Sequence, residues 1–450
     1  MRVKLSESEY KKSKFTMCLK NEQGQLILFN SYTGYDSLCK IDKDYADTFA
    51  ELFNNYKINN LDKSFIHTLE DKGHIVSAME DEQIKLKEIY MDTIHQKTLH
   101  LIILPTEKCN FKCKYCYESF VNGRMKEDVM DKIISFVDHK MKKLERLSVS
   151  WFGGEPLLEM GVIEKLSEAF IKICSKYKKI YSAEITTNGY LLNLNTFKRL
   201  YALKVLTYQI TIDGMGSVHN IQRPLLDGSP TFDKIIGNLK DIKENVKSRF
   251  FSVIIRTNCS RNIMNSIRDY FTYIESAFGN DKRFQILLRP VMDWGGDRVA
   301  EMSEGMIEMN DLGTGYDTLS QFDLGIEVYK NFFNRGAQVC YAGKCNQYCF
   351  NSVGEIFKCT CDLDGLHDSK IGCIMSEKEI NSYQYQLWLS EFRYKNNQCD
   401  SCFYSPICLM DWCPSKRIHK EKNNLCPIDF YSFNHLIRLF DKKGLIKQIV

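Results

Sequence analysis

Six short runs of apolar residues recur between residues 98 and 289, and most are separated by stretches with helical spacing. One such stretch, residues 127–142, places Val129, Ile133 and Val137 on one face of a helix. Strands that alternate with helices in this way predict parallel β/α units, whose ligands gather at the carboxyl ends of the strands. The predicted strands are Thr98–Leu104, Leu147–Phe152, Ala183–Thr187, Leu206–Ile212, Phe251–Thr257 and Phe284–Arg289.

The residues before these units predict a smaller α+β module. Gln25–Phe29 has the pattern of a strand, and Asp44–Asn55 has the spacing of an amphipathic helix. Cys18 and Cys39 are expected to be core thiols. The chain is therefore predicted to have four parts: a module at 1–95, a β/α core at 96–295, a bridging segment at 296–338 and a cysteine-rich domain at 339–450.

Composition narrows the class of protein. The chain has 450 residues, 26% of them charged, with a net charge of +4, so it lacks the strong positive field of a nucleic-acid-binding protein. Neither a membrane span nor a signal peptide is visible in the sequence, and we expect a cytoplasmic protein. Eighteen cysteines in a reducing compartment indicate metal rather than disulfides, and eleven of them lie between Cys340 and Cys426.

Three cysteines follow the first predicted strand of the core. Cys109, Cys113 and Cys116 have C-x3-C-x2-C spacing, and three thiolates hold three irons of a four-iron cluster while the fourth iron stays open for a ligand. A zinc knuckle is the alternative, but zinc scaffolds normally supply cysteines in pairs. With Tyr115 before the last cysteine, the pattern C-x3-C-x-aromatic-C resembles that of the radical S-adenosylmethionine (SAM) enzymes. The resemblance implies a partial (β/α)6 barrel that binds a [4Fe-4S] cluster and SAM, and a low-potential donor such as flavodoxin or ferredoxin.

The resemblance extends to polar residues at the strand ends. Gly153, Gly154, Glu155 and Pro156 follow the second strand, and in the family this run holds the amino group of SAM. Further strand-end residues resemble family positions that contact the ribose, carboxylate and adenine of SAM, although each also suits an ordinary turn. These residues are Asn188, Thr211, Arg256 and Asn258, together with Arg223, whose charged fork suits a carboxylate.

The cysteine-rich domain resembles the SPASM extension of radical SAM peptide-modifying enzymes, which holds two auxiliary clusters. One cluster would use Cys340, Cys359 and Cys413, with Cys345 or Cys349 as the fourth ligand or with that position open. Four residues precede Cys413 where the family usually has three, and zinc knuckles remain the alternative. The other cluster would use Cys399, Cys402, Cys408 and Cys426.

The combined resemblance implies a maturase of ribosomally made peptides. We expect a 5′-deoxyadenosyl radical to abstract hydrogen from a precursor peptide and a cross-link, most simply a thioether, to follow. Residues 1–95, as a winged-helix-like module, would bind the peptide leader as an added strand. Asp213 and Asp362 are the candidate acid/base residues.

Two other functions are considered. A sulfatase-maturating enzyme that makes formylglycine would carry Asp directly after Cys359, where this chain has Thr360. A non-catalytic iron–sulfur electron carrier would need neither an open cluster nor the Gly153–Glu155 run.

Overall fold

The computed structural model describes residues 10–55, 58–118, 121–291, 305–307, 309–363, 369–391, 397–411, 413–419, 426 and 430–449. The chain forms two compact units, each assembled from separate stretches. Unit 1 comprises Met1–Ile94, Tyr329–Cys340 and Ser390–Val450, and unit 2 comprises His95–Val328 and Tyr341–Leu389.

Unit 2 is built on a nine-stranded sheet with the order β11-β10-β9-β8-β7-β6-β12-β13-β14. The six strands from β6 to β11 are parallel, as the sequence predicts, and their bounds differ from the predicted ones by a few residues at most. These strands are β6 (Thr98–Ile103), β7 (Arg146–Trp151), β8 (Ile180–Thr187), β9 (Val205–Thr211), β10 (Ser252–Cys259) and β11 (Phe284–Pro290).

Three further strands widen this sheet beyond β6. β12 (Gln347–Phe350) pairs parallel with β6, and β13 (Glu355–Phe357) and β14 (Lys370–Cys373) continue antiparallel. The sequence does not predict this extension, because strands of three or four residues are too short to show a period.

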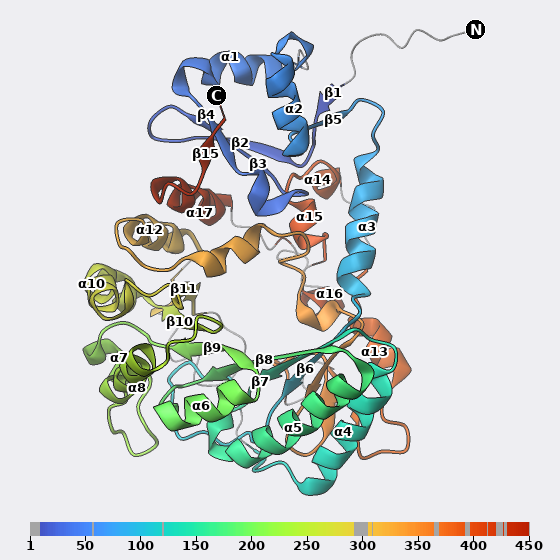
Figure 1. The fold of residues 1–450 in the computed structure, drawn as a ribbon, viewed down its shortest axis with the longest axis vertical. Helices are drawn as coiled ribbons and strands as arrows, with labels where there is room; N and C mark the ends of the chain where they lie inside the picture. Colours follow the sequence, from blue (N-terminus) through green and yellow to red (C-terminus); the bar gives the residue numbers. More distant parts are fainter. Residues whose placement is uncertain are drawn as a thin grey trace. The chain divides into compact units, whose positions relative to one another are not determined.

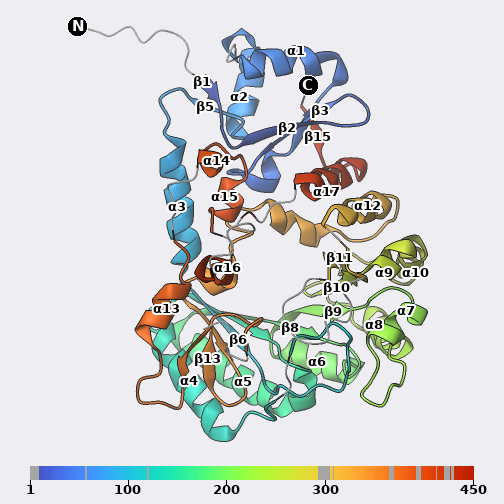
Figure 2. The same cartoon turned by 180° about the vertical axis from the view of Figure 1, so that it is seen from behind.

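Helices connect successive parallel strands of unit 2 and pack on one face of the sheet (Figures 1 and 2). Val129, Ile133 and Val137 of the first helix are buried, which confirms the predicted apolar face. The helices are α4 (Glu127–Met141), α5 (Met160–Tyr177), α6 (Leu194–Ala202), α7 (Gly216–Gln222), α8 (Phe232–Asn245), α9 (Arg261–Asn265), α10 (Ile267–Phe278), α12 (Met309–Leu319) and, beyond β14, α13 (Ser382–Trp388).

Unit 1 contains a four-stranded sheet in the order β15-β4-β3-β2. The strands are β2 (Thr16–Lys20), β3 (Leu26–Asn30), β4 (Cys39–Ile41) and β15 (Lys447–Gln448), and a separate pair joins β1 (Tyr10–Lys12) to β5 (Ile75–Ser77). The helices of this unit are α1 (Lys43–Asn54), α2 (Lys63–Asp71), α3 (Glu82–Ile94), α14 (Asn397–Asp400), α15 (Ser405–Cys408), α16 (Pro414–Ile418) and α17 (Phe430–Lys442).

Two predictions for the first module are tested by these elements. α1 and β3 confirm the predicted helix and strand. Cys39 is fully buried, as expected, but Cys18 is exposed, so its assignment as a core thiol is wrong. Thr16, Cys18 and Lys20 share one face of β2, and this face is covered only at Thr16, so Cys18 is exposed together with Lys20.

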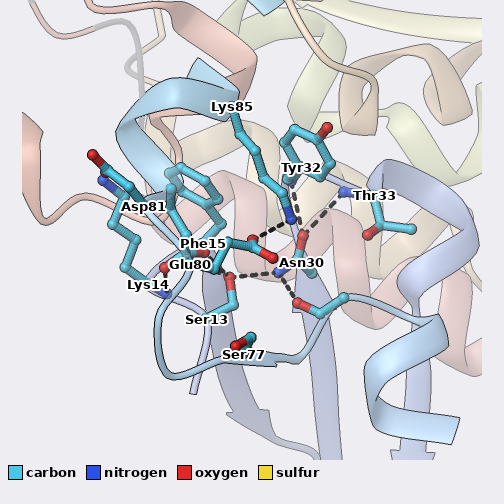
Figure 3. A network of polar contacts seen from close by, with 12 residues as sticks. Ser13, Lys14, Phe15, Asn30, Tyr32, Thr33, Ser77, Glu80, Asp81 and Lys85 are labelled. Atoms are coloured by element: carbon cyan, nitrogen blue, oxygen red, sulfur yellow. Dashed lines mark hydrogen bonds and ion pairs between the residues drawn. The ribbon is translucent and has the colours of Figure 1, made fainter. Parts of the chain in front are cut away.

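A buried network of hydrogen bonds connects segments of the first module, and Figure 3 shows it from close by. The Asn30 amide nitrogen donates to Ser13 Oγ at 3.1 Å and to the Gly73 carbonyl at 2.5 Å. Its amide oxygen accepts from the backbone N–H groups of Tyr32 and Thr33, each at 3.0 Å. One side chain therefore fixes the end of β3 against the turn before β5.

Helices that are both long and apolar enough to cross a membrane are absent from the described part of the chain.

Candidate active site

The three motif cysteines lie in a loop that follows β6. Backbone N–H groups of Lys112 and Lys114 donate to the carbonyls of Pro224 and Gln222, which fastens the loop beside the end of α7. The pKa of the Cys109 thiol is raised to about 12, mainly by burial and to a smaller extent by Glu155 and the neighbouring thiols of Cys113 and Cys116. The three thiols therefore converge. Chelation by a cluster would favour their deprotonated forms.

Two glycines let this loop approach the end of β7. A Cβ on Gly154 would lie 2.4 Å from the carbonyl oxygens of Glu107 and Lys108, and Gly153, with φ of +113°, would place one 2.4 Å from the Thr106 carbonyl. Any other residue type would push the two backbone segments apart. The Glu155 N–H donates to the Lys108 carbonyl at 2.9 Å and closes the contact.

The Glu155 carboxylate is fully buried. It accepts hydrogen bonds from the Thr187 hydroxyl at 2.8 Å, the Asn188 N–H at 2.8 Å and the Leu157 N–H at 3.0 Å. Burial raises its pKa, and these hydrogen bonds oppose the rise. A carboxylate has about four acceptor positions, so one remains for an ammonium group.

Two neighbours of Glu155 have structural partners as well. Pro156 is buried and opens a 3₁₀ turn at Pro156–Glu159, where its missing N–H is not needed. The Asn188 side chain donates to Asn110 Oδ1 at 2.8 Å and so ties the end of β8 to the cysteine loop.

Tyr115 is the centre of a buried polar cluster. Its hydroxyl donates to the Asp213 carboxylate and accepts from Arg223 Nη1 at 2.5 Å and Asn258 Nδ2 at 3.0 Å. Asp213 also accepts from the Asn258 N–H at 2.8 Å. Burial raises the pKa of Asp213, whereas the Arg223 charge lowers it. Asp213 therefore orients its neighbours, and Thr211 lies buried just before it at the end of β9.

Two arginines supply positive charge near this cluster. Arg223 is buried, and its Nε–H has no hydrogen-bond partner among the residues that the structure describes, which leaves a donor for a carboxylate. Arg256 Nε donates to Asn258 Oδ1 at 2.8 Å. Burial, followed by the charge of Arg289, lowers the pKa of Arg256.

These residues fit SAM bound to an open-iron cluster. Glu155 has an acceptor for the amino group, Arg223 has a donor for the carboxylate, and three thiols converge beside them. Such a cofactor pair supplies an electron and a 5′-deoxyadenosyl radical when bound.

Four cysteines of the tail converge inside unit 1. Burial raises the pKa of the Cys399 thiol, and Cys402 and Cys426 add to the rise. Burial is also the main cause that raises the pKa of Cys408 to about 12, with smaller effects of Cys402, Cys426 and Cys399. Among the described residues no set of three or more Cys, His, Asp or Glu side chains is gathered around a single-ion site.

The other predicted auxiliary ligands are divided between the units. Cys340 and Cys413 belong to unit 1, whereas Cys345, Cys349 and Cys359 belong to unit 2. Inside unit 2, Cys359 raises the pKa of the buried Cys349 thiol, and the Cys345 thiol lies 3.2 Å from Nδ1 of His95.

Asp362, the second candidate acid/base residue, is buried. Its carboxylate accepts from the Ser369 N–H at 2.7 Å, and its carbonyl accepts from the Ser369 hydroxyl at the same distance. This aspartate therefore shapes the loop between β13 and β14.

Sequence reasoning missed three features of the site. The motif requires only an aromatic residue at Tyr115 and does not predict the hydrogen bonds of its hydroxyl. Asn110 lies inside the cysteine motif, and the motif assigns no role to it. Glu118 lies directly after the motif, and burial, followed by the charges of Glu107 and Glu155, raises its pKa to about 8.

Residues 103–269 match the model of the Radical SAM superfamily. This stretch holds the cysteine loop, the Gly153–Glu155 run and the Tyr115 cluster. This stretch is a radical SAM domain, within a mixed α/β fold that has a large, mostly parallel sheet.

Two curated relatives extend beyond that domain. The radical SAM cyclopropyl synthase TigE of Paramaledivibacter caminithermalis is 23% identical over 404 residues, 79% of this chain and 80% of that protein. The cysteine-type anaerobic sulfatase-maturating enzyme of Clostridium novyi is 24% identical over 346 residues, 69% of this chain and 87% of that protein.

Two solved structures share the fold. The enzyme anSMEcpe with bound AdoMet and the Kp18Cys peptide has a TM-score of 0.56 at 20% identity, covering 77% of this chain and 97% of that one. Streptococcus suis SuiB bound to the precursor peptide SuiA has a TM-score of 0.51 at 17% identity, covering 93% and 100%.

Proposed function

We propose that this enzyme is a maturase of a ribosomally made precursor peptide. The observation that carries the proposal is the extent of the similarity: the two curated relatives match 79% and 69% of this chain, whereas the radical SAM domain covers only residues 103–269. One of these relatives matures a sulfatase, and the two structures hold peptides. The substrate class, a peptide with a leader segment, follows from these proteins by analogy.

The bond formed is proposed to be a thioether from a peptide cysteine. Hydrogen abstraction from a carbon of the peptide would be followed by carbon–sulfur bond formation, in which the thiol loses its proton and a proposed auxiliary cluster accepts the remaining electron. The likeness to a cyclopropyl synthase supports a carbon–carbon bond as a second candidate. Formylglycine formation is less well supported, because Thr360 follows Cys359 and Asp362 is bonded to Ser369.

The tail is proposed to hold two auxiliary [4Fe-4S] clusters. The mutual approach of Cys399, Cys402, Cys408 and Cys426 supports one of them. Cys340, Cys359 and Cys413 would serve the other, and the effect of Cys359 on Cys349 favours Cys349 over Cys345 as its fourth ligand. Asp213 and Asp362 stay candidates for proton transfer only if substrate displaces their present donors.

The remaining partners are proposed on the same analogy. The module at the start of the chain would bind the leader of the peptide as an added strand. Flavodoxin or ferredoxin would supply electrons, and the enzyme would work in the cytoplasm.

We expect a small cysteine-containing peptide to be encoded beside the gene, and peptide maturation is tested with that peptide. The anaerobically reconstituted enzyme, SAM, a reductant and this peptide should give a product that lacks two hydrogen atoms and whose cysteine no longer reacts with iodoacetamide. Replacement of the cysteine sulfur by oxygen would instead identify formylglycine. An unaltered peptide, with SAM still cleaved, would contradict the proposal.

A matched pair of variants distinguishes loss of the cluster from the general effect of removing a buried thiol. Cys113→Ala should abolish both SAM cleavage and product formation, whereas Cys174→Ala, which removes a buried thiol of α5, should leave both in place. Iron content tests the tail independently: three four-iron clusters require about 12 iron atoms per chain, and the SAM cluster alone about 4.

A further inference from the structure

Three polar side chains from neighbouring strands form a hydrogen-bonded row across the sheet of unit 2. His100 lies on β6, Ser150 on β7 and Glu184 on β8. His100 Nε2 lies 2.9 Å from Ser150 Oγ, and the Ser150 hydroxyl donates to Glu184 Oε1 at 2.6 Å. We call these three residues the polar row.

The polar row lies on the face of the sheet that is turned away from the helices. Val149 and Trp151, the neighbours of Ser150 along β7, are fully buried, and so is Ile185 beside Glu184. Side chains alternate along a strand, and α5 packs against β7 and β8 on the face of those buried residues. Glu184 is exposed on the opposite face.

The hydrogen-bond directions in the row follow from the charge of its members. Burial, followed by the charges of Lys344 and Lys358, lowers the pKa of His100 to about 4, so the imidazole is neutral at pH 7. Because Ser150 donates to Glu184, its oxygen is left to accept from His100 Nε2–H. Each donor thus points toward Glu184, and the glutamate is held in place.

Glu184 has one hydrogen bond and, within the described ranges, no cationic partner. One bond leaves most of the acceptor positions of a carboxylate open. Three residues further along β8, the Thr187 hydroxyl binds Glu155, so Glu184 lies about 10 Å along the strand from the proposed SAM site. This separation suits a group on the substrate rather than on SAM.

We propose that Glu184 binds a cationic group of the substrate peptide, an ammonium or a guanidinium, and that Ser150 and His100 are positioning residues. The inference rests on the proposed function, because it takes a peptide as substrate. It adds a recognition rule: the peptide carries a positive charge near the residue that is modified.

Binding of a fluorescent version of the peptide encoded beside the gene tests this rule. With the reconstituted enzyme and SAM present, Glu184→Gln should weaken binding roughly tenfold, the effect of losing one charge-assisted contact. Glu168→Gln, which removes an exposed charge from α5, is the matched control and should bind like the wild type.

Neutralised peptides identify the cation. Lys is replaced by norleucine, Arg by citrulline and the terminal amine by its acetylated form, one at a time. The weakening caused by Glu184→Gln should vanish for one of these peptides, and that peptide identifies the source of the charge. If Glu184→Gln binds the original peptide as the wild type does, or stays weakened for every neutralised peptide, the inference is overturned.

The positioning role has its own readout. Ser150→Ala should weaken binding of the cationic peptide but not of its neutralised form, and Ser150→Thr, which keeps the hydroxyl, should restore it. Equal losses for both peptides would show a merely structural serine. If the wild type binds no peptide at all, the proposed function fails together with this inference, whereas peptide binding that is indifferent to Glu184 overturns the inference alone.

Discussion

Gly154 lies where the backbone of the cysteine loop meets the end of β7. We predict that Gly154→Ala will lose most of the iron bound by the cysteine loop, because its Cβ would overlap the carbonyl oxygens of Glu107 and Lys108 at 2.4 Å. Iron per chain after anaerobic reconstitution measures the effect and should fall by about 4 atoms, the content of one cluster.

Gly237→Ala is the matched control for that variant. This glycine lies in α8 with open space around its Cβ position, so alanine should keep the full iron content and stabilise the helix by up to about 1 kcal/mol. Full iron in Gly154→Ala would show that the two backbone segments are able to separate without loss of the cluster.

Arg223 offers a second test on a single side chain. Lysine keeps the charge but loses the Nε–H and the planar fork, so Arg223→Lys should weaken SAM binding roughly tenfold. Equilibrium dialysis with labelled SAM measures it. Arg199 forms an exposed ion pair with Glu164, so Arg199→Lys is the control and should bind SAM normally. Equal affinities of the wild type and both variants would show that Arg223 does not contact SAM.

At this scale the sequence predicted residue types better than their partners. The convergence of Cys109, Cys113 and Cys116 follows from their spacing. The burial of Asp213 under Tyr115, Arg223 and Asn258 does not, because these residues are brought together by three different segments of the chain.

At the scale of elements, the buried carboxylate of Asp441 helps to fasten α17 to the first module. Asp441 Oδ1 accepts from Lys40 Nζ at 2.9 Å, and Oδ2 accepts from the Asn21 amide at 2.7 Å. Because it is almost fully buried, Asp441→Ala should destabilise unit 1 by roughly 2 to 3 kcal/mol.

Hydrogen exchange locates that effect. Amides of β4 should exchange faster in Asp441→Ala, while those of β8 in unit 2 should be unchanged. The control is Asp47→Ala, which breaks the ion pair between Asp47 and Lys20. The Asp47 side chain is 89% exposed, so this variant should leave the protection of β4 amides unaltered. Uniformly faster exchange in both units would contradict a local role for Asp441.

The parallel strands could be predicted because each is a buried apolar run with a helix behind it. β15 could not, since two exposed residues carry no periodic signal and its partner, β4, lies at the other end of the chain. The prediction that Cys18 is a core thiol is wrong for a related reason: the sequence of one five-residue strand does not show which of its faces is covered.

At the scale of the whole molecule, three buried histidines predict sensitivity to acid. Burial is the main cause that lowers the pKa of His74 and His219 to about 3 and that of His100 to about 4. In the unfolded chain these histidines bind protons near pH 6.5, whereas in the folded chain they stay neutral to a lower pH. Their contribution to stability is therefore complete above pH 6.5 and is lost as the pH falls toward 4. Each histidine contributes at most roughly 2 kcal/mol of this loss at pH 5.

Urea unfolding at pH 7.5 and pH 5 measures this loss. His74→Gln keeps a donor for the Ser37 carbonyl, which lies 3.0 Å from Nε2, but does not titrate. The stability of this variant should therefore fall less between the two pH values than that of the wild type. An identical fall would mean that His74 is already protonated or already exposed in the folded protein.

Whole-molecule organisation is the level at which local patterns are least informative. The radical SAM domain could be placed from its motifs, because they follow the strands in order. The composition of unit 1 rests on contacts between segments such as Asn21 and Asp441, which are 420 residues apart, and no window of sequence contains both.

That separation also sets an order of events during synthesis. A ribosome makes about 5 to 20 residues each second, so the sheet at the start of the chain waits for tens of seconds before α17 and β15 emerge. Until then β4 has an unpaired edge, the kind of surface on which nascent chains associate. Unit 2 can form in the interval, so a segment translated before unit 2 belongs to a unit that is completed after it.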